Sequence, residues 1–310
     1  HPQHRRQRQM CIRDRFTTLY TIIAIPVGSL IPAMTQDRDE RTSLASFRYL
    51  GASSGSITVA VLTLPLVGLF SSPQVGFPIV VGCLAVLGAI FAFLCFFNTK
   101  EVYSKPYEES IGVKKVTKMV FNNYPLHFVI LALLTTWVAN NIKQLTVVYF
   151  VKYNLQLEAY FSLILLGVIL QIMFGAYLIN VIKHKFEKKT LFMIGTFLYV
   201  ITDLIIYYIT GYENFWLLAF IATFGFIGFG MAGVMAWSMI ADTIEYGEWK
   251  SGFRAEGVLN AAHVFVFKLS VGFSAWLAGV ILESTDYVAN ASQQTPETLN
   301  GLFILSLIHI

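Results

Sequence analysis

Charged residues are scarce in this sequence. Only 13% of its 310 residues are Asp, Glu, Lys or Arg, about half the share found in soluble domains. Hydrophobic residues make up 56% of the chain, and its mean hydropathy is +0.63. Because so few polar side chains cannot cover a surface that faces water, the composition predicts an integral membrane protein.

Cysteine is rare too, and motifs of catalysis are missing. Cys11, Cys83 and Cys95 have the spacing of neither a disulfide framework nor a zinc site. The stretch GFGMAG, Gly228 to Gly233, matches a dinucleotide-binding pattern, but no strand precedes it; small residues that let membrane helices approach closely are the better interpretation. We therefore expect no enzyme, no cofactor, no nucleic acid and no obligatory protein partner.

Long apolar runs are what the chain has in abundance. A helix needs about 20 mostly apolar residues to cross a bilayer. Eight runs qualify, and a ninth begins near Leu302; the eight cover residues 16–34, 45–70, 76–97, 125–150, 159–182, 190–210, 214–240 and 258–282. Their length favours helices over barrel strands, so the predicted fold class is all-α.

Basic residues lie almost entirely in alternate connections. Fourteen Lys and Arg fall on one side of the predicted membrane, whereas the other connections hold only Lys152. Since cytoplasmic loops are rich in Lys and Arg, we expect a multi-pass protein of the plasma or inner membrane. Its cytoplasmic loops would be residues 35–44, 98–124, 183–189 and 241–257.

Two segments depart from this pattern. Residues 1–15 carry five arginines on the predicted outer side; we expect residues 1–15 to be non-native or disordered, and residues 306–310 to be non-native as well. Residues 98–124 form the longest connection, which predicts a middle loop between two helical bundles. Within it, VKKVTKMVF (Val113–Phe121) has the spacing of an interfacial helix, with a flexible linker as the alternative.

Several polar residues lie deep in the predicted spans, where they are costly and commonly functional. Lys268 lies about ten residues into its span and needs a polar cavity or an acidic partner. His263 either lines the same cavity or packs in the core.

A second polar group surrounds Lys143 in the sequence ANNIKQL. Asn140 and Gln144 share one helical face, and Asn141 lies beside it. We expect this helix to line an aqueous path, with helix-to-helix hydrogen bonding as the alternative. Asp203 is placed near the membrane interface.

Two stretches carry a family resemblance. IPVGSLIPAMTQDRDERTSLASFR (Ile25–Arg48) and ADTIEYGEWKSGFRAEG (Ala241–Gly257) resemble the glycoside-pentoside-hexuronide:cation symporters, a melibiose-permease-like branch of the major facilitator superfamily. NTKEVYS, Asn98–Ser104, also resembles the start of that family's middle loop. The family has two six-helix bundles. In its register residues 16–97 are helices 4 to 6 and residues 125–310 are helices 7 to 11 with the start of helix 12, so the first three helices are missing.

The resemblance implies roles for individual residues. Tyr20, Arg48 and Lys268 match sugar-site positions, Thr21 matches a cation-site position, and His263 replaces a pocket Gln. With Asn140, Asn141 and Gln144 these are the candidate binding residues. Ala24, Gly28 and Gly233 stand where the melibiose type has Asp, Trp and Trp, which disfavours an α-galactoside; a pentoside, an oligosaccharide or a hexuronide fits better.

The charged stretch that ends the seventh span also has a role in the resemblance. Asp242, Glu245 and Arg254 match a cytoplasmic charge network whose partner is Arg41 in this chain. Asp242 and Glu245 share one face of a helix C-terminus, where the helix dipole favours cationic partners. We expect pairs between bundles to hold an inner gate closed; charges that only solvate a loop are the alternative.

The resulting prediction is a secondary active transporter that moves a sugar or glycoside with Na⁺, H⁺ or Li⁺. A lysolipid or other amphiphile transporter of the same fold is the first alternative. An inactive truncated product is the second.

Overall fold

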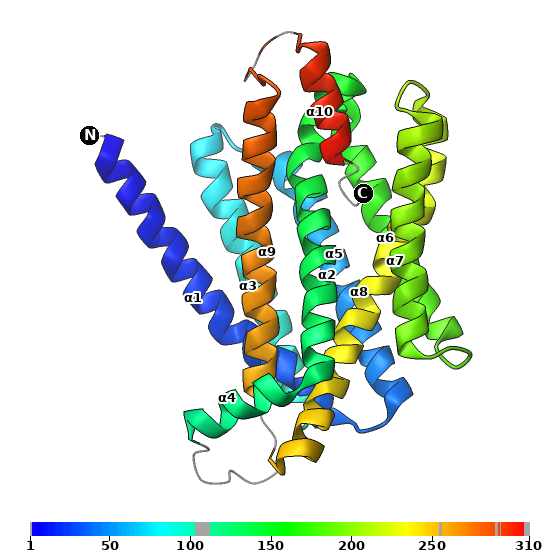
Figure 1. The fold of residues 1–310 in the computed structure, drawn as a ribbon. Helices are drawn as coiled ribbons and strands as arrows, with labels where there is room; N and C mark the ends of the chain where they lie inside the picture. The colour runs from blue at the N-terminus through cyan, green and yellow to red at the C-terminus, as the bar shows by residue number, and fades with distance from the viewer. Residues whose placement is uncertain (1, 103–111, 254–255, 289–290, 292, 307–310) are drawn as a thin grey trace.

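The computed structural model describes residues 2–102, 112–253, 256–288, 291 and 293–306, and in them every regular element is a helix (Figure 1). The long helices run roughly side by side, and α4 lies across one end of the bundle (Figure 1). Their bounds are α1 Pro2–Met34, α2 Arg38–Val67, α3 Pro73–Asn98, α4 Val113–Asn122, α5 Tyr124–Tyr149, α6 Phe161–Ile182, α7 Lys188–Ile205, α8 Phe215–Ser251, α9 Glu256–Ser284 and α10 Pro296–Ser306. Short π- and 3₁₀-helical turns follow α5 and α7 and precede α6; they are η1 Phe150–Asn154, η3 Ile206–Thr210 and η2 Glu158–Tyr160.

The described residues contain eight helices long and apolar enough to cross a membrane, as the hydropathy predicts. The clearest difference in bounds concerns α8. The predicted span ends at Ile240, whereas the helix continues to Ser251 and stops at Gly252, whose φ of 78° is left-handed. Most of the expected loop 241–257 is therefore helix, because Asp242 and Glu245 find cationic partners that keep the last turns folded.

Close packing of small residues holds together the second half of the described chain, which comprises α5 to α10, with α8 between α6 and α7. A Cβ atom on Gly230 would lie 2.1 Å from the carbonyl oxygen of Ile172 in α6, and one on Gly228 would lie 2.5 Å from that of Gly195 in α7. The GFGMAG stretch is thus a contact surface between helices, as its composition indicates.

The first half of the described chain, which comprises α1 to α3, contacts the second half along two lines. Helix α2 packs against α6 and α8, and α1 packs against α9. Residues 2–15, which we expected to be non-native or disordered, form the first turns of α1. Their non-native origin stays a prediction. The part of α1 that lies away from α9 leans outward from the bundle (Figure 1).

The middle connection contains the expected short helix. In α4, Met119 is buried against Leu126, Ile244 and Leu259, while Lys114, Lys115 and Lys118 are exposed. This two-sided character is typical of a helix lying at a membrane surface. Residues 103–111 of the predicted loop lie outside the described residues.

Candidate functional site

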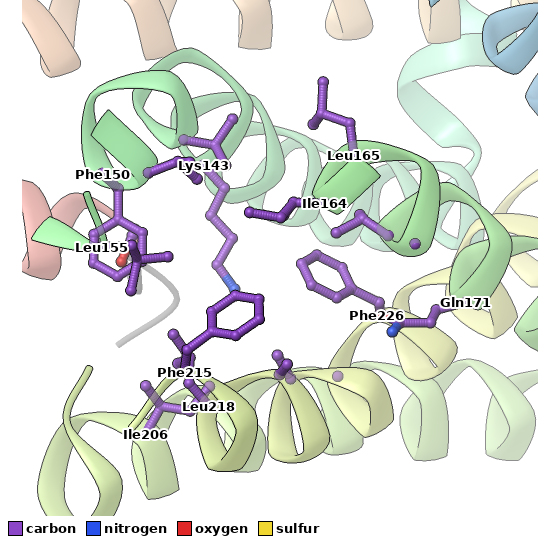
Figure 2. Close-up of a pocket in the computed structure, with 18 of the residues that line it drawn as sticks. Lys143, Phe150, Leu155, Ile164, Leu165, Gln171, Ile206, Phe215, Leu218 and Phe226 are labelled. Carbon is purple, nitrogen blue, oxygen red and sulfur yellow. The ribbon is translucent and has the colours of Figure 1, made fainter. Parts of the chain in front are cut away.

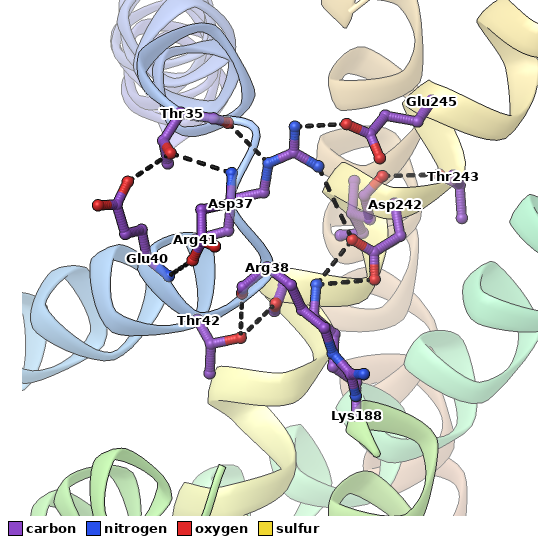
Figure 3. A network of polar contacts seen from close by, with 12 residues as sticks. Thr35, Asp37, Arg38, Glu40, Arg41, Thr42, Lys188, Asp242, Thr243 and Glu245 are labelled. Carbon is purple, nitrogen blue, oxygen red and sulfur yellow. Dashed lines mark hydrogen bonds and ion pairs between the residues drawn. The ribbon is translucent and has the colours of Figure 1, made fainter. Parts of the chain in front are cut away.

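Four charged side chains meet where α2 begins and α8 ends; we call them the Arg41 cluster (Arg41, Lys188, Asp242 and Glu245). Arg41 Nη2 donates to Glu245 Oε1 at 2.5 Å, and Arg41 Nη1 lies 4.0 Å from Asp242 Oδ1. Arg41 Nε also donates to the carbonyl oxygen of Thr35 at 2.8 Å (Figure 3). The Arg41 side chain is only 2% exposed, whereas both carboxylates are 44% exposed. A buried cation of the first half is thus held by carboxylates of the second.

Lys188 completes the cluster from α7. Its ammonium group contacts both carboxylate oxygens of Asp242, at 2.7 and 2.8 Å. The expected pairing is therefore refined: Glu245 is the main partner of Arg41, and Asp242 belongs mainly to Lys188. The residues line a polar recess of about 400 Å³ at this end of the molecule. Arg254 lies outside the described residues, so its expected place in the network stays a prediction.

Uncharged contacts extend the same interface into the membrane. Thr42 and Ser238 share a hydrogen bond of 3.2 Å between α2 and α8. One turn further, Ser46 Oγ donates to the carbonyl oxygen of Ala176 at 2.8 Å, and Asn180 Nδ2 donates to Ser46 Oγ at 2.7 Å. The two halves are therefore closed against each other over several turns at this end.

The turn before α2 is fixed by Asp37, which caps the helix. The backbone N–H groups of Glu40 and Asp39 donate to its Oδ1 at 2.8 and 2.9 Å. Because these bonds favour the ionised carboxylate, the bond from Glu40 above all, the pKa of Asp37 lies below its ordinary value. The cap sets where α2 starts and hence where Arg41 points.

Deeper in the protein, α2, α8 and α9 bring together the Trp237 cluster (Arg48, Trp237 and His263). The guanidinium carbon of Arg48 lies 4.1 Å from the centre of the Trp237 ring. The His263 ring meets Trp237 edge to face at 4.3 Å and is 3% exposed. Arg48 Nη1 and His263 Nδ1 are buried without a hydrogen-bond partner in the described structure. A cation, an aromatic face and an imidazole are the groups that bind a polar ring-shaped ligand.

The sequence prediction missed Trp237. The resemblance placed the aromatic residue of the pocket one helical turn earlier, at Gly233. In the structure the Tyr49 ring occupies the space beside Gly233. A Cβ atom on Gly233 would lie 2.7 Å from the Tyr49 ring. Gly28 is covered in the same way, because a Cβ atom on it would lie 3.0 Å from Asn260 Oδ1. The i,i+4 spacing of Gly233 and Trp237 on one helical face was the available signal.

The neighbouring Lys268 cluster (Tyr20, Thr21 and Lys268) connects α1 to α9. Lys268 Nζ donates to Thr21 Oγ1 and, at 3.4 Å, to the carbonyl oxygen of Thr17. It also lies 5.9 Å from the centre of the Tyr20 ring. Lys268 therefore has polar surroundings, as expected: a hydroxyl group, a backbone carbonyl group and a tyrosine ring. The cation-binding role of Thr21 stays a prediction.

A separate cavity of about 830 Å³ lies within the second half, between α5, α6, α7 and α8. Its walls are mostly apolar, with Phe150, Ile164, Phe215 and Phe226 around Lys143 (Figure 2). Lys143 Nζ contacts both carboxylate oxygens of Asp203 at 2.7 Å. Asp203 is 2% exposed, and the ion pair with Lys143 offsets the cost of burying it. Its expected place near the membrane interface stays a prediction.

The polar residues around Lys143 divide between two surfaces. Asn140 and Gln144 line this cavity, as their shared face predicts. Asn141 turns the other way and donates to Ser270 Oγ in α9 at 3.2 Å. The group therefore combines the cavity-lining and the helix-to-helix interpretations, and its binding role stays a prediction.

Comparison with known proteins places this geometry in a family. A family model described as MFS/sugar transport protein matches residues 9–310. The uncharacterized symporter YjmB of Bacillus subtilis is 34% identical over 94% of this chain and 63% of its own length. A putative sulfoquinovose importer of Escherichia coli is 32% identical over 93% and 61% of the respective chains. An isoprimeverose transporter of Lactiplantibacillus pentosus is 29% identical, with 92% and 60% covered.

These matches run through all eight membrane helices, although the chain spans only about 60% of the length of the curated relatives that it matches. The relatives named above are transporters, not enzymes. The chain therefore belongs to the MFS/sugar transport protein family, and within it to the glycoside-pentoside-hexuronide:cation symporters that its sequence resembles.

Proposed function

We propose that this protein moves a sugar or glycoside across a cell membrane together with Na⁺ or H⁺, by alternating access. The observation that carries the proposal is the position of the Trp237 cluster. It joins Arg48 of the first half to Trp237 and His263 of the second, so a ligand bound there would contact both halves. Substrate at such an interface is the arrangement that rocking bundles require.

The Arg41 cluster supports the same mechanism as a gate. Both carboxylates of the cluster are 44% exposed, so water can replace their cationic partners and the pairs can break and re-form in each cycle. We place this end of the bundle in the cytoplasm, because α4 lies across the same end and its lysines are exposed. Cytoplasmic loops are rich in Lys and Arg, and anionic lipid attracts such a surface. The structure is then closed to the cytoplasm.

Uptake by the full gene product tests the proposal. Cells or proteoliposomes should accumulate a labelled glycoside only when a Na⁺ or H⁺ gradient is imposed, and collapsing that gradient should stop accumulation. Equal uptake with and without any gradient would contradict cation coupling.

A second candidate function has an observation of its own. The apolar cavity of about 830 Å³ is large enough for an acyl chain, which favours transport of a lysolipid or another amphiphile. Labelled lysolipid that crosses proteoliposomes faster than it crosses protein-free liposomes would support this candidate. Glycoside uptake that excess lysolipid leaves unchanged would count against it.

A further inference from the structure

Asn123 joins the start of α5 to the gate end of α8. The residue is only 1% exposed. Its Nδ2 donates to the carbonyl oxygen of Thr243 at 2.8 Å, while its Oδ1 accepts a hydrogen bond from the backbone N–H of Leu126 at 3.2 Å. The bond from Leu126 caps α5. One buried amide thus performs two tasks, and the bond to Thr243 is not needed for the cap.

The contact reaches the segment of α8 that carries the gate carboxylates. Thr243 lies between Asp242 and Glu245 in the sequence. A helix has about 3.6 residues per turn, so neighbouring side chains point to different sides of it. Asp242 and Glu245 point toward their cationic partners (Figure 3), whereas Ile244 packs against Met119 of α4. The end of α8 is therefore held on two sides.

The two sides differ in how long their contacts last. Arg41 belongs to the first half, so its bond to Glu245 breaks whenever the halves separate at this end. The bond from Asn123 does not involve the first half, and neither does a second one, in which Lys250 Nζ donates to the carbonyl oxygen of Asn122 at 3.0 Å. These contacts can keep the last turns of α8 in place while the gate is open.

We infer that Asn123 is a positioning residue of the gate: it holds the end of α8 so that Glu245 meets Arg41 each time the two halves close. The inference rests on the proposed alternating access and identifies a residue that sets its closed state. Asparagine suits this task because its amide carries a donor and an acceptor together. Serine retains an acceptor that caps a helix but has no amide that extends to α8.

A buried cysteine measures the gate without any substrate. Ser238 is 0% exposed and lies at the contact between α2 and α8, so a cysteine there reacts with a maleimide only when this end opens. The full gene product, with its other cysteines changed to Ser, carries Ser238→Cys in lipid nanodiscs. Its labelling rate is then proportional to the ratio of open to closed molecules. Asn123→Ser should raise this rate roughly fivefold, the effect of one lost hydrogen bond.

Two further variants separate positioning from support of the fold. Asn214→Ser is the matched control and should leave the rate unchanged, because Asn214 caps the opposite end of α8, where the backbone N–H of Leu217 donates to its Oδ1 at 3.1 Å. Arg41→Gln should itself raise the rate. Adding Asn123→Ser should then change little, because the position of Glu245 no longer matters. A residue that only supports the fold would raise the rate equally in both backgrounds.

The outcomes distinguish this inference from the proposed function. Equal labelling with and without Asn123→Ser, or a rise that persists in Arg41→Gln, would overturn the role of Asn123 and leave alternating access standing. Absence of labelling even in Arg41→Gln would contradict opening at this end, and with it the proposed transport cycle.

A second variant decides if Asn123→Ser fails to fold. Gly247→Ala leaves the asparagine in the chain, but its methyl group would lie 3.1 Å from Asn123 Nδ2 and would push the amide away from Thr243. It should raise the labelling rate in the same direction. An unchanged rate in Gly247→Ala would overturn the inference.

Discussion

At the scale of single residues, Lys268 is one of the cations that connect the two halves. It extends from α9 to Thr21 and Thr17 on α1. Lys268→Ala should reduce coupled uptake at least tenfold, because the variant loses this contact and a charge of the binding region. The measurement is gradient-driven uptake of a labelled glycoside, normalised to protein in the membrane.

Lys152→Ala is the matched control, since it removes a lysine whose side chain is 36% exposed and whose carboxylate partner lies at 3.5 Å. It should transport normally. Unaltered uptake by Lys268→Ala would show that Lys268 has no role in the cycle.

Much of the candidate site follows from residue types, but not its exact members. Lys268 and Lys143 are conspicuous in sequence because charge is rare in apolar spans. That Lys143 pairs with Asp203 across 60 positions depends on how α5 and α7 pack, and hydropathy contains no such information. Trp237 was missed for a related reason: one aromatic among many becomes a site residue only when Arg48 and His263 meet it.

At the scale of the helix ends, the charges of Arg41 and Glu245 can be exchanged by substitution. Arg41→Glu places a carboxylate against Glu245 and should impair uptake, because like charges repel where a 2.5 Å bond existed. Adding Glu245→Arg restores opposite charges and should recover part of the transport.

The control is the same kind of charge exchange between Arg41 and its more distant partner, Asp242. Arg41→Asp combined with Asp242→Arg should recover less, since Asp242 is 4.0 Å from Arg41 and only 2.7 Å from Lys188. The new arginine would face that lysine. Equal rescue by both exchanges, or normal uptake by Arg41→Glu alone, would mean that the charges act only through the general potential of this end.

Packing between elements gives a prediction about stability. Gly230→Ala would place a methyl group 2.1 Å from the Ile172 carbonyl oxygen, which forces α6 and α8 apart. Overpacking of this kind costs about 1–3 kcal/mol, so the thermal unfolding midpoint in detergent should fall. Gly272→Ala, which meets nothing within 4 Å, should not lower it. Equal midpoints would show that α6 and α8 tolerate wider spacing.

At the scale of the whole molecule, the fold was largely predictable because the bilayer restricts a chain to a few solutions. Backbone groups in lipid need partners within their own segment, so each long apolar run must be a helix. The end of α8 at Ser251 was not predictable in this way. Its last turns are polar and fold on contacts with Arg41 and Lys188, which belong to distant parts of the chain.

At this scale the Thr42–Ser238 contact between α2 and α8 is a probe for movement of the two halves relative to each other. Alternating access requires this contact to open in each cycle, whereas a static interface would keep it closed. Cys11, Cys83 and Cys95 are exposed and would first be changed to Ser. Thr42→Cys with Ser238→Cys should then cross-link on oxidation and stop uptake, and reduction should restore it. Each single cysteine variant should transport before and after oxidation. Continued uptake by a pair shown on a gel to be cross-linked would rule out opening at this end.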